Sequence, residues 1–129
     1  MLRPKALHHV ALSVADMDKT LHFYQALGLT LLRTSGPDAD GVRSAVLRMG
    51  SQELNVFHTP GFVAGDDANG TGMHHYCLDM DAGSMDELMA ELGEAGLRVV
   101  RGPVQRRDGI SVFVHDPDGV RVELRIGHS

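Results

Sequence analysis

The chain has 129 residues, of which 43% are hydrophobic and 22% charged, and a formal net charge of −5. These values are ordinary for one compact globular domain, and no run of lysine and arginine is longer than Arg106-Arg107, which argues against a nucleic-acid partner. The single cysteine, Cys77, excludes an intramolecular disulfide, and no signal-like run opens the chain, so we expect a cytoplasmic protein. No apolar stretch approaches the ~20 residues that cross a bilayer, so we expect no membrane partner.

The first half of the chain predicts a strand, a helix and three further strands. The first strand is expected at about 7–14, and the helix starts after Asp16, a residue type that caps helix N-termini. Gly28 is expected to end this helix, because glycine adopts the left-handed C-cap conformation most easily. Turn residues then separate three strands, at about 29–34, 42–49 and 52–58.

A segment rich in glycine, aspartate and asparagine follows, at about 59–72. A loop of this length without hydrophobic periodicity is typical of a hinge or of a lid over a site. We interpret it as the linker between the two halves of the chain.

The second half predicts the same order of elements. A strand is expected at about 73–80, and Ser84 and Glu87 then have the spacing of a capping box at the start of a helix. Gly96 is expected to close that helix. Three strands follow, at about 97–101, 109–115 and 120–127.

The two halves also resemble each other residue by residue. Segment 7–14 resembles 73–80 at an offset of 66 residues, and 26–33 resembles 94–101 at an offset of 68 residues. Near-constant offsets in two separate matches favour a duplicated unit over chance. The sequence therefore predicts an α+β fold of two tandem βαβββ modules, at about 6–58 and 73–127.

Strand alternation selects a small group of polar residues, because successive side chains of a strand point to opposite faces. On the first strand of each module, it separates His9 and His75 from the bulky apolar residues that must pack under the helix, and it turns His8 and His74 away. On the last strand it separates Glu123 from its apolar neighbours. We therefore predict that His9, His75 and Glu123 share one polar face.

Two imidazoles and one carboxylate form a facial set that binds Fe(II) and also suits Mn, Ni, Co or Zn. Open positions would remain for water and for a substrate that offers two oxygens. The sequence thus predicts one divalent metal ion and no other cofactor-binding residues. The alternative is that the histidines are structural and that Glu123 is a solvated strand residue between Arg121 and Arg125.

Further candidates lie near this set. Either Glu53 or Asn55, on the last strand of the first module, could fill a fourth corner that corresponds to Glu123. Glu53, if it does not bind metal, and His115, at a strand end near the proposed site, could carry protons. Arg106 is interpreted as part of a charged loop.

Several stretches carry a resemblance to a known family: Leu7–Met17, Phe23-Tyr24, Leu27–Leu29 and Phe113–Leu124. With His75 between them, they resemble the vicinal oxygen chelate (glyoxalase/bleomycin resistance/dioxygenase) superfamily over nearly the whole chain. The runs Gly102–Arg106 and Ser111–Phe113 look most like glyoxalase-domain-containing protein 5 and its virulence-associated relatives.

The resemblance implies that the two modules pair into a cupped mixed sheet within a single domain, 1–129, with the metal inside. It implies that His9, His75 and Glu123 are the ligands, and Asn55 aligns best with the fourth corner. Pairing between subunits is frequent in this superfamily, so the resemblance also implies a homodimer that binds a small-molecule substrate.

The function expected from these features is a divalent-metal-dependent enzyme, dioxygenase-like or lyase-like, acting on a small substrate with vicinal oxygens. One alternative is lactoylglutathione lyase (glyoxalase I), which usually places a carboxylate or glutamine where this chain has Asn55. Another is a metal-free binding protein of the bleomycin-resistance type, which tends to lack the ligand set that this chain keeps.

Overall fold

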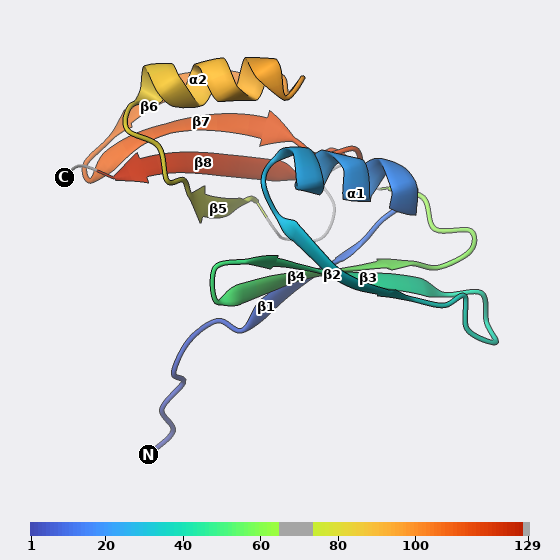
Figure 1. The fold of residues 1–129 in the computed structure, drawn as a ribbon. Helices are drawn as coiled ribbons and strands as arrows, with labels where there is room; N and C mark the ends of the chain where they lie inside the picture. Colours follow the sequence, from blue (N-terminus) through green and yellow to red (C-terminus); the bar gives the residue numbers. More distant parts are fainter. Residues whose placement is uncertain (65–73, 128–129) are drawn as a thin grey trace. The chain divides into compact units, whose positions relative to one another are not determined.

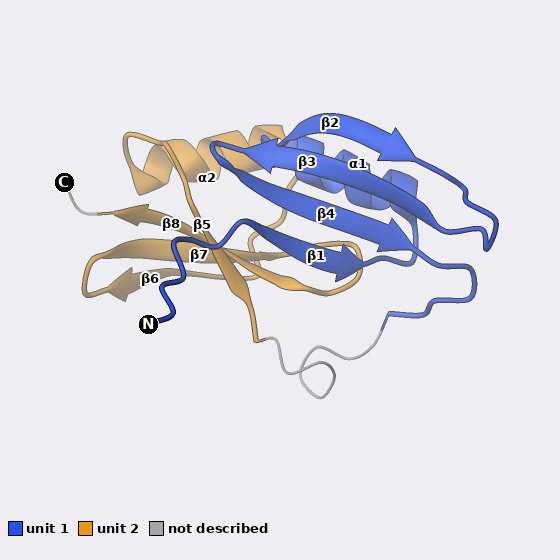
Figure 2. Ribbon diagram, turned by 90° about the horizontal axis from the view of Figure 1, so that it is seen from below, with its two compact units in different colours: residues 1–64 blue, residues 65–129 orange. Residues whose placement is uncertain are grey.

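A computed structural model describes residues 1–64 and 74–127. The part of the predicted linker from 65 to 72, and Met73 of the second repeat, lie outside the described residues. The chain divides into two compact units, Met1–Ala64 (unit 1) and Gly65–Ser129 (unit 2), which Figure 2 colours separately.

Unit 1 contains one helix and one four-stranded sheet (Figure 1). Its sheet has the order β1-β4-β3-β2, in which β1 runs parallel to β4 and the other pairs are antiparallel. The elements are β1 His9–Ser13, α1 Met17–Ala26, β2 Thr30–Ser35, β3 Arg43–Met49 and β4 Gln52–His58.

Unit 2 repeats this topology. Its sheet has the order β5-β8-β7-β6, with β5 parallel to β8 and the other pairs antiparallel. The α+β fold of two tandem βαβββ modules is therefore confirmed, and the sheet of each module is mixed. The elements are β5 Tyr76–Asp79, α2 Met85–Glu94, β6 Arg101–Arg106, β7 Gly109–His115 and β8 Arg121–Gly127.

The predicted helix signals have their expected roles. Asp16 Oδ1 accepts a hydrogen bond from the Lys19 amide at 2.9 Å, and Ser84 Oγ accepts one from the Glu87 amide at 3.1 Å. The Glu87 carboxylate in turn accepts from the Gly83 amide at 3.0 Å, so the reciprocal bond of the capping box reaches one residue further back. Neither helix in the described parts of the chain is long and apolar enough to cross a bilayer.

The sixth strand differs from the prediction, which placed it at 97–101. The Leu97 amide donates instead to the Leu92 carbonyl at 2.9 Å, which closes the end of α2 and keeps this residue out of the sheet. Strand β6 begins at Arg101 and continues to Arg106. Arg106 therefore belongs to a strand, and its interpretation as a loop residue was wrong.

One face of each sheet packs under its helix and holds the apolar core. Figure 1 shows α2 lying along one face of the β5–β8 sheet. The opposite face of each sheet carries the polar members of the alternating pattern, including every candidate site residue on a strand. The most deeply buried core side chains are Val14, Tyr24, Leu47 and Val56 in unit 1, and Leu88, Val112, Val114, Val122 and Leu124 in unit 2.

Candidate functional site

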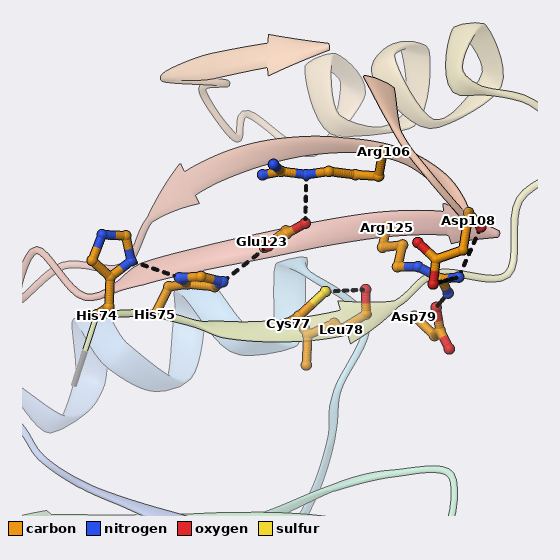
Figure 3. Close-up of polar contacts among 9 residues, drawn as sticks. All are labelled: His74, His75, Cys77, Leu78, Asp79, Arg106, Asp108, Glu123 and Arg125. Atoms are coloured by element: carbon orange, nitrogen blue, oxygen red, sulfur yellow. Dashed lines mark hydrogen bonds and ion pairs between the residues drawn. The ribbon is translucent and has the colours of Figure 1, made fainter. Parts of the chain in front are cut away.

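Glu123 is a buried carboxylate in the middle of β8, with only 7% of its surface exposed. Its register partners are Cys77 on β5 and Phe113 on β7. Its Oε1 lies 3.0 Å from His75 Nε2, and its Oε2 lies 3.6 Å from Arg106 Nε (Figure 3). A carboxylate this deep needs polar partners to offset its desolvation, and these two groups provide them. The alternative that Glu123 is a solvated strand residue was therefore wrong.

His75 is joined to a second histidine rather than separated from it. His74 Nδ1 lies 2.7 Å from His75 Nδ1, so the prediction that His74 points away was wrong. Both residues precede β5, which begins at Tyr76, so strand alternation does not apply to them. Figure 3 shows the His75 ring between His74 and Glu123.

These contacts fix a direction for the hydrogen bonds. Arg121 Nη1 lies 3.3 Å from His74 Nε2, and a guanidinium can only donate, so His74 Nε2 is the acceptor. His74 then carries its hydrogen on Nδ1 and donates it to His75 Nδ1. His75 consequently carries its hydrogen on Nε2 and donates it to Glu123. The order Arg121–His74–His75–Glu123 thus leaves both imidazoles neutral.

The aromatic ring of Phe113 lies beside the His75–Glu123 pair, and the residue is only 4% exposed. The His75 ring meets it edge-on, with centroids 5.8 Å apart. The guanidinium carbons of Arg101 and Arg106 lie 5.3 and 5.7 Å from the Phe113 centroid, within the range of a cation–π interaction. Arg106 thus contacts both the carboxylate and the ring. Its contact with the site was missed because only the observed length of β6 brings it to this face.

Cys77 is an exposed free thiol beside Glu123 in the sheet register. Its pKa is raised from 9.0 to about 11, mainly because the thiol is partly desolvated, and further by the negative charges of Glu123 and Asp79. Two arginines oppose this shift without reversing it. In the metal-free protein the thiol is therefore protonated at neutral pH and is a poor nucleophile.

Unit 1 contains the corresponding pattern. His9 begins β1 and is exposed, and its Nδ1 lies 2.9 Å from His8 Nδ1, so His8 also lies against its neighbour and does not point away. On the parallel pair β1–β4, His9 is opposite Glu53 and Ala11 is opposite Asn55. Glu53 is therefore the strand neighbour of His9. On the polar face, Glu53 is half-buried and His9 is exposed.

The sheet registers distinguish the two fourth-corner candidates. Ala11 pairs with Asn55 in unit 1, and Cys77, which is the repeat equivalent of Ala11, pairs with Glu123 in unit 2. Asn55, and not Glu53, therefore occupies the register position that corresponds to Glu123. Its Oδ1 is buried and has no hydrogen-bond partner among the residues that the structure describes. An unpaired buried oxygen of this kind is costly unless a ligand satisfies it.

The structure brings His75 and Glu123 together in unit 2, and it places His9, Glu53 and Asn55 on the polar face of unit 1. His115 lies at the end of β7, opposite Arg121. Within residues 1–64 and 74–127, no group of three or more His, Cys, Asp or Glu side chains is arranged to hold a metal. The three-ligand centre therefore stays a prediction, and the observed part of it is the His75–Glu123 pair.

The geometry of that pair suits a metal. Two cis ligands that each lie about 2.1 Å from an octahedral ion are about 3.0 Å apart. His75 Nε2 and Glu123 Oε1 are 3.0 Å apart and are the preferred donor types of Fe(II), Mn and Zn. A divalent ion could therefore replace the hydrogen that these two atoms share.

Comparison with known proteins adds independent information. The family model described as the Glyoxalase/Bleomycin resistance protein/Dioxygenase superfamily matches residues 6–124. The glyoxalase domain-containing protein RDO1 of Mycosarcoma maydis is 31% identical over 95% of this chain and 69% of its own length. A probable lactoylglutathione lyase of Synechocystis is 32% identical over 92% of both chains. The crystal structure of a glyoxalase family protein from Enterococcus faecalis has a TM-score of 0.78 at 27% identity, covering 94% of this chain and 97% of that one.

Proposed function

The chain belongs to the glyoxalase/bleomycin resistance/dioxygenase superfamily, and from that premise we propose that it is a divalent-metal-dependent enzyme acting on a small substrate with vicinal oxygens. In this proposal the two modules act as one domain, 1–129. His9, His75 and Glu123 are the metal ligands, and Asn55 occupies a fourth, weakly binding corner. The ion is Fe, Mn, Ni, Co or Zn.

The observation that carries the proposal is the contact between the buried carboxylate of Glu123 and the exposed imidazole of His75. A carboxylate and a neutral imidazole lie 3.0 Å apart on the polar face of the sheet. His9 stands at the repeat-equivalent position of unit 1, exposed on the corresponding face. Buried charge paired with imidazole in this way is common at functional sites, although structural networks also produce it.

The residues around the pair define what the chain contributes. Arg106 holds the second oxygen of Glu123, which leaves Oε1 directed at His75. To act as a ligand through Nε2, His75 must give up the hydrogen that it now donates to Glu123. If that hydrogen moves to Nδ1, His74 must accept it and carry its own hydrogen on Nε2, which excludes the present bond from Arg121. A bound divalent ion would supply a Lewis acid that polarises a substrate oxygen.

Lyase chemistry and dioxygenase chemistry are each supported by one observation. The Synechocystis relative is named a probable lactoylglutathione lyase, and its match extends over 92% of both chains, which favours lyase chemistry. The neutral Asn55, in place of a second carboxylate, favours a centre with more open coordination, as a dioxygenase needs. In this proposal Glu53, the register partner of His9, moves a proton at the substrate. Lactoylglutathione lyase is therefore kept as the second candidate.

The proposal extends to the assembly and the location of the protein. We expect a homodimer, as the superfamily resemblance implies, and a cytoplasmic location, as the single cysteine suggests. Size-exclusion chromatography with light scattering would measure the first.

Metal content is the decisive experiment. Protein purified without a histidine tag and reconstituted with each candidate ion should hold about one ion per chain, measured by elemental analysis. His75→Ala and Glu123→Ala should abolish that content, whereas His22→Ala, which changes an exposed helix residue, should retain it. Stoichiometric metal in the His75 variant would contradict the ligand assignment. No tightly held ion in the reconstituted wild-type protein would favour the metal-free binding protein instead.

Substrate tests then separate the two reactions. The metal-loaded protein should be assayed with methylglyoxal–glutathione hemithioacetal for lyase activity and with catechols for ring cleavage. Turnover of the hemithioacetal alone would identify a lactoylglutathione lyase. Oxygen consumption with a catechol would identify a dioxygenase.

A further inference from the structure

A concave pocket of about 370 Å³ lies within unit 2, beside the His75–Glu123 pair. A volume of this order suits a small organic molecule. The residues that line it are His74, Val100, Arg101, Phe113, His115 and Arg121.

The sheet register shows how the pocket relates to Glu123. Arg101, Phe113 and Glu123 form one row across β6, β7 and β8, and their side chains share a face. His115 and Arg121 form the adjacent row on the same face. Arg121 and Glu123 are two residues apart on β8, so their Cα atoms are separated by about 7 Å. The pocket is therefore a direct extension of the candidate site.

The charged residues of the lining are both arginines. Arg101 and Arg121 are accompanied by two histidines and by no aspartate or glutamate, although the whole chain has a net charge of −5 with neutral histidines. Such a local reversal of charge attracts anions. Arg121 already donates toward His74, which holds its side chain at the pocket wall.

The arginine beside the ring has the chemistry to recognise a planar anion. Arg101 lies over the face of Phe113, with its guanidinium carbon 5.3 Å from the ring centroid. Stacking uses the flat face of a guanidinium, while its hydrogen-bond donors lie along the edge in a fork that matches a carboxylate. Val100, which is 43% exposed, supplies apolar surface to the pocket that a fully hydrated inorganic anion would not use, whereas Phe113 is 4% exposed and lies under Arg101.

We propose that this pocket binds the carboxylate of a small organic acid at Arg101, with the apolar body of the ligand resting on Val100. This inference rests on the proposed function, and it identifies the substrate class as a compound that carries an anionic group in addition to the oxygens held at the metal. Recognition of the anion itself needs no metal, so the two proposals can fail separately.

Benzoate is a suitable probe for the metal-free protein, with benzyl alcohol as its neutral counterpart and inorganic phosphate as a hydrated anion. Titration followed by amide chemical shifts should show benzoate binding that weakens with added salt, and weaker or no binding of the other two. Equal affinity for benzoate and benzyl alcohol, or for benzoate and phosphate, would overturn the assignment.

Variants locate the binding. Arg101→Gln should weaken benzoate about tenfold or more, the loss expected for one charge-assisted hydrogen-bonded pair. Arg33→Gln, which alters an exposed arginine of unit 1, is the matched control and should bind as the wild type does. Circular dichroism verifies that each variant is folded. Unchanged benzoate affinity in a folded Arg101 variant would place the anion elsewhere and overturn the proposal.

A last pair of measurements separates this proposal from the metal centre. Glu123→Gln should lose metal but keep or strengthen benzoate binding, because it removes a negative charge near the pocket. Arg101→Gln should keep its metal and lose benzoate. Benzoate binding in a wild-type protein that takes up no metal would support the pocket while refuting the metal centre, and the converse result would refute the pocket alone.

Discussion

Asn55 stands in unit 1 at the register position that Glu123 occupies in unit 2. The pairings Ala11–Asn55 and Cys77–Glu123 establish this correspondence. The two modules thus share a backbone position but differ in charge at it. The Glu123 carboxylate has a histidine and an arginine as partners, whereas Asn55 Oδ1 is buried without a partner in the described parts of the chain.

Restoring the symmetry by Asn55→Glu should have opposite effects with and without metal. The metal-free variant should lose about 1–3 kcal/mol of stability, because it places a carboxylate at a position that offers no hydrogen bond. If the corner faces the metal, the ion should bind about tenfold more tightly or better, because one more anionic ligand is present. Chemical denaturation and competition with a chelator measure the two effects.

Asn55→Leu is the control for that experiment. It removes the unsatisfied oxygen without adding charge, so the metal-free protein should be equally or more stable. Its metal affinity should not rise. Two results would show that position 55 does not face the ion. One is tighter metal binding in the leucine variant, and the other is unchanged metal affinity in the glutamate variant.

Cys77 should react slowly in the metal-free protein. With a pKa of about 11 against 9.0 for an unperturbed thiol, it has roughly a hundredfold less thiolate at pH 8. Its alkylation by iodoacetamide should therefore be slow at pH 8, rise about tenfold per pH unit and level off only above pH 11. Mass spectrometry measures the rate, with a denatured sample as the reference. A native rate at pH 8 equal to the denatured one would contradict the raised pKa.

The same shift has a consequence for stability. Because the folded pKa exceeds the unfolded one, the stabilising contribution is complete below pH 9 and is lost as the pH rises through 11. The effect is reduced by solvent, because the residue is exposed. Cys77→Ser should therefore show a shallower loss of stability between pH 9 and 11 than the wild type.

Local signals account for the parts of the fold that the sequence predicted well. Repetition identified both modules, and the caps Asp16 and Ser84 start their helices as expected, because an N-cap depends only on residues within one turn. Alternation placed Glu123 on the polar face correctly, because it lies in mid-strand.

Alternation failed where the strand had not yet begun. His74 and His75 precede β5, so their rings meet instead of diverging. Arg106 was missed for a related reason. The start of β6 depends on where the chain leaves α2, and on a register shift between Arg101 and Val104, which no local pattern encodes. Pairing between strands that are distant in the sequence decides where β5 begins and how far β6 extends.

Gly102 should be intolerant of a side chain. It has φ +105°, and an added Cβ would lie 2.8 Å from the Ser111 carbonyl oxygen on the neighbouring strand. Gly102→Ala should therefore cost several kcal/mol, because it adds a backbone clash to the conformational strain, which is itself about 1–2 kcal/mol. Gly96→Ala is the matched control, since Gly96 has φ +75° and open space around it. Equal losses in urea denaturation would mean that the contact with Ser111 relaxes freely.

Arg106 should oppose the metal while supporting the metal-free protein. Its Nε lies 3.6 Å from Glu123 Oε2, and its guanidinium also covers Phe113. Arg106→Gln should therefore destabilise the metal-free chain by about 1–3 kcal/mol, because a buried carboxylate loses a charged partner. The same change removes a positive charge beside the proposed ion, so metal affinity should rise. Arg125→Gln is the control, because Arg125 lies on β8, two residues after Glu123, but pairs with Asp79 and Asp108. Denaturation of the metal-free proteins and chelator competition of the loaded ones give the two readouts. A fall in both stability and metal affinity for the Arg106 variant alone would show that Arg106 positions Glu123 for the metal instead of competing with it.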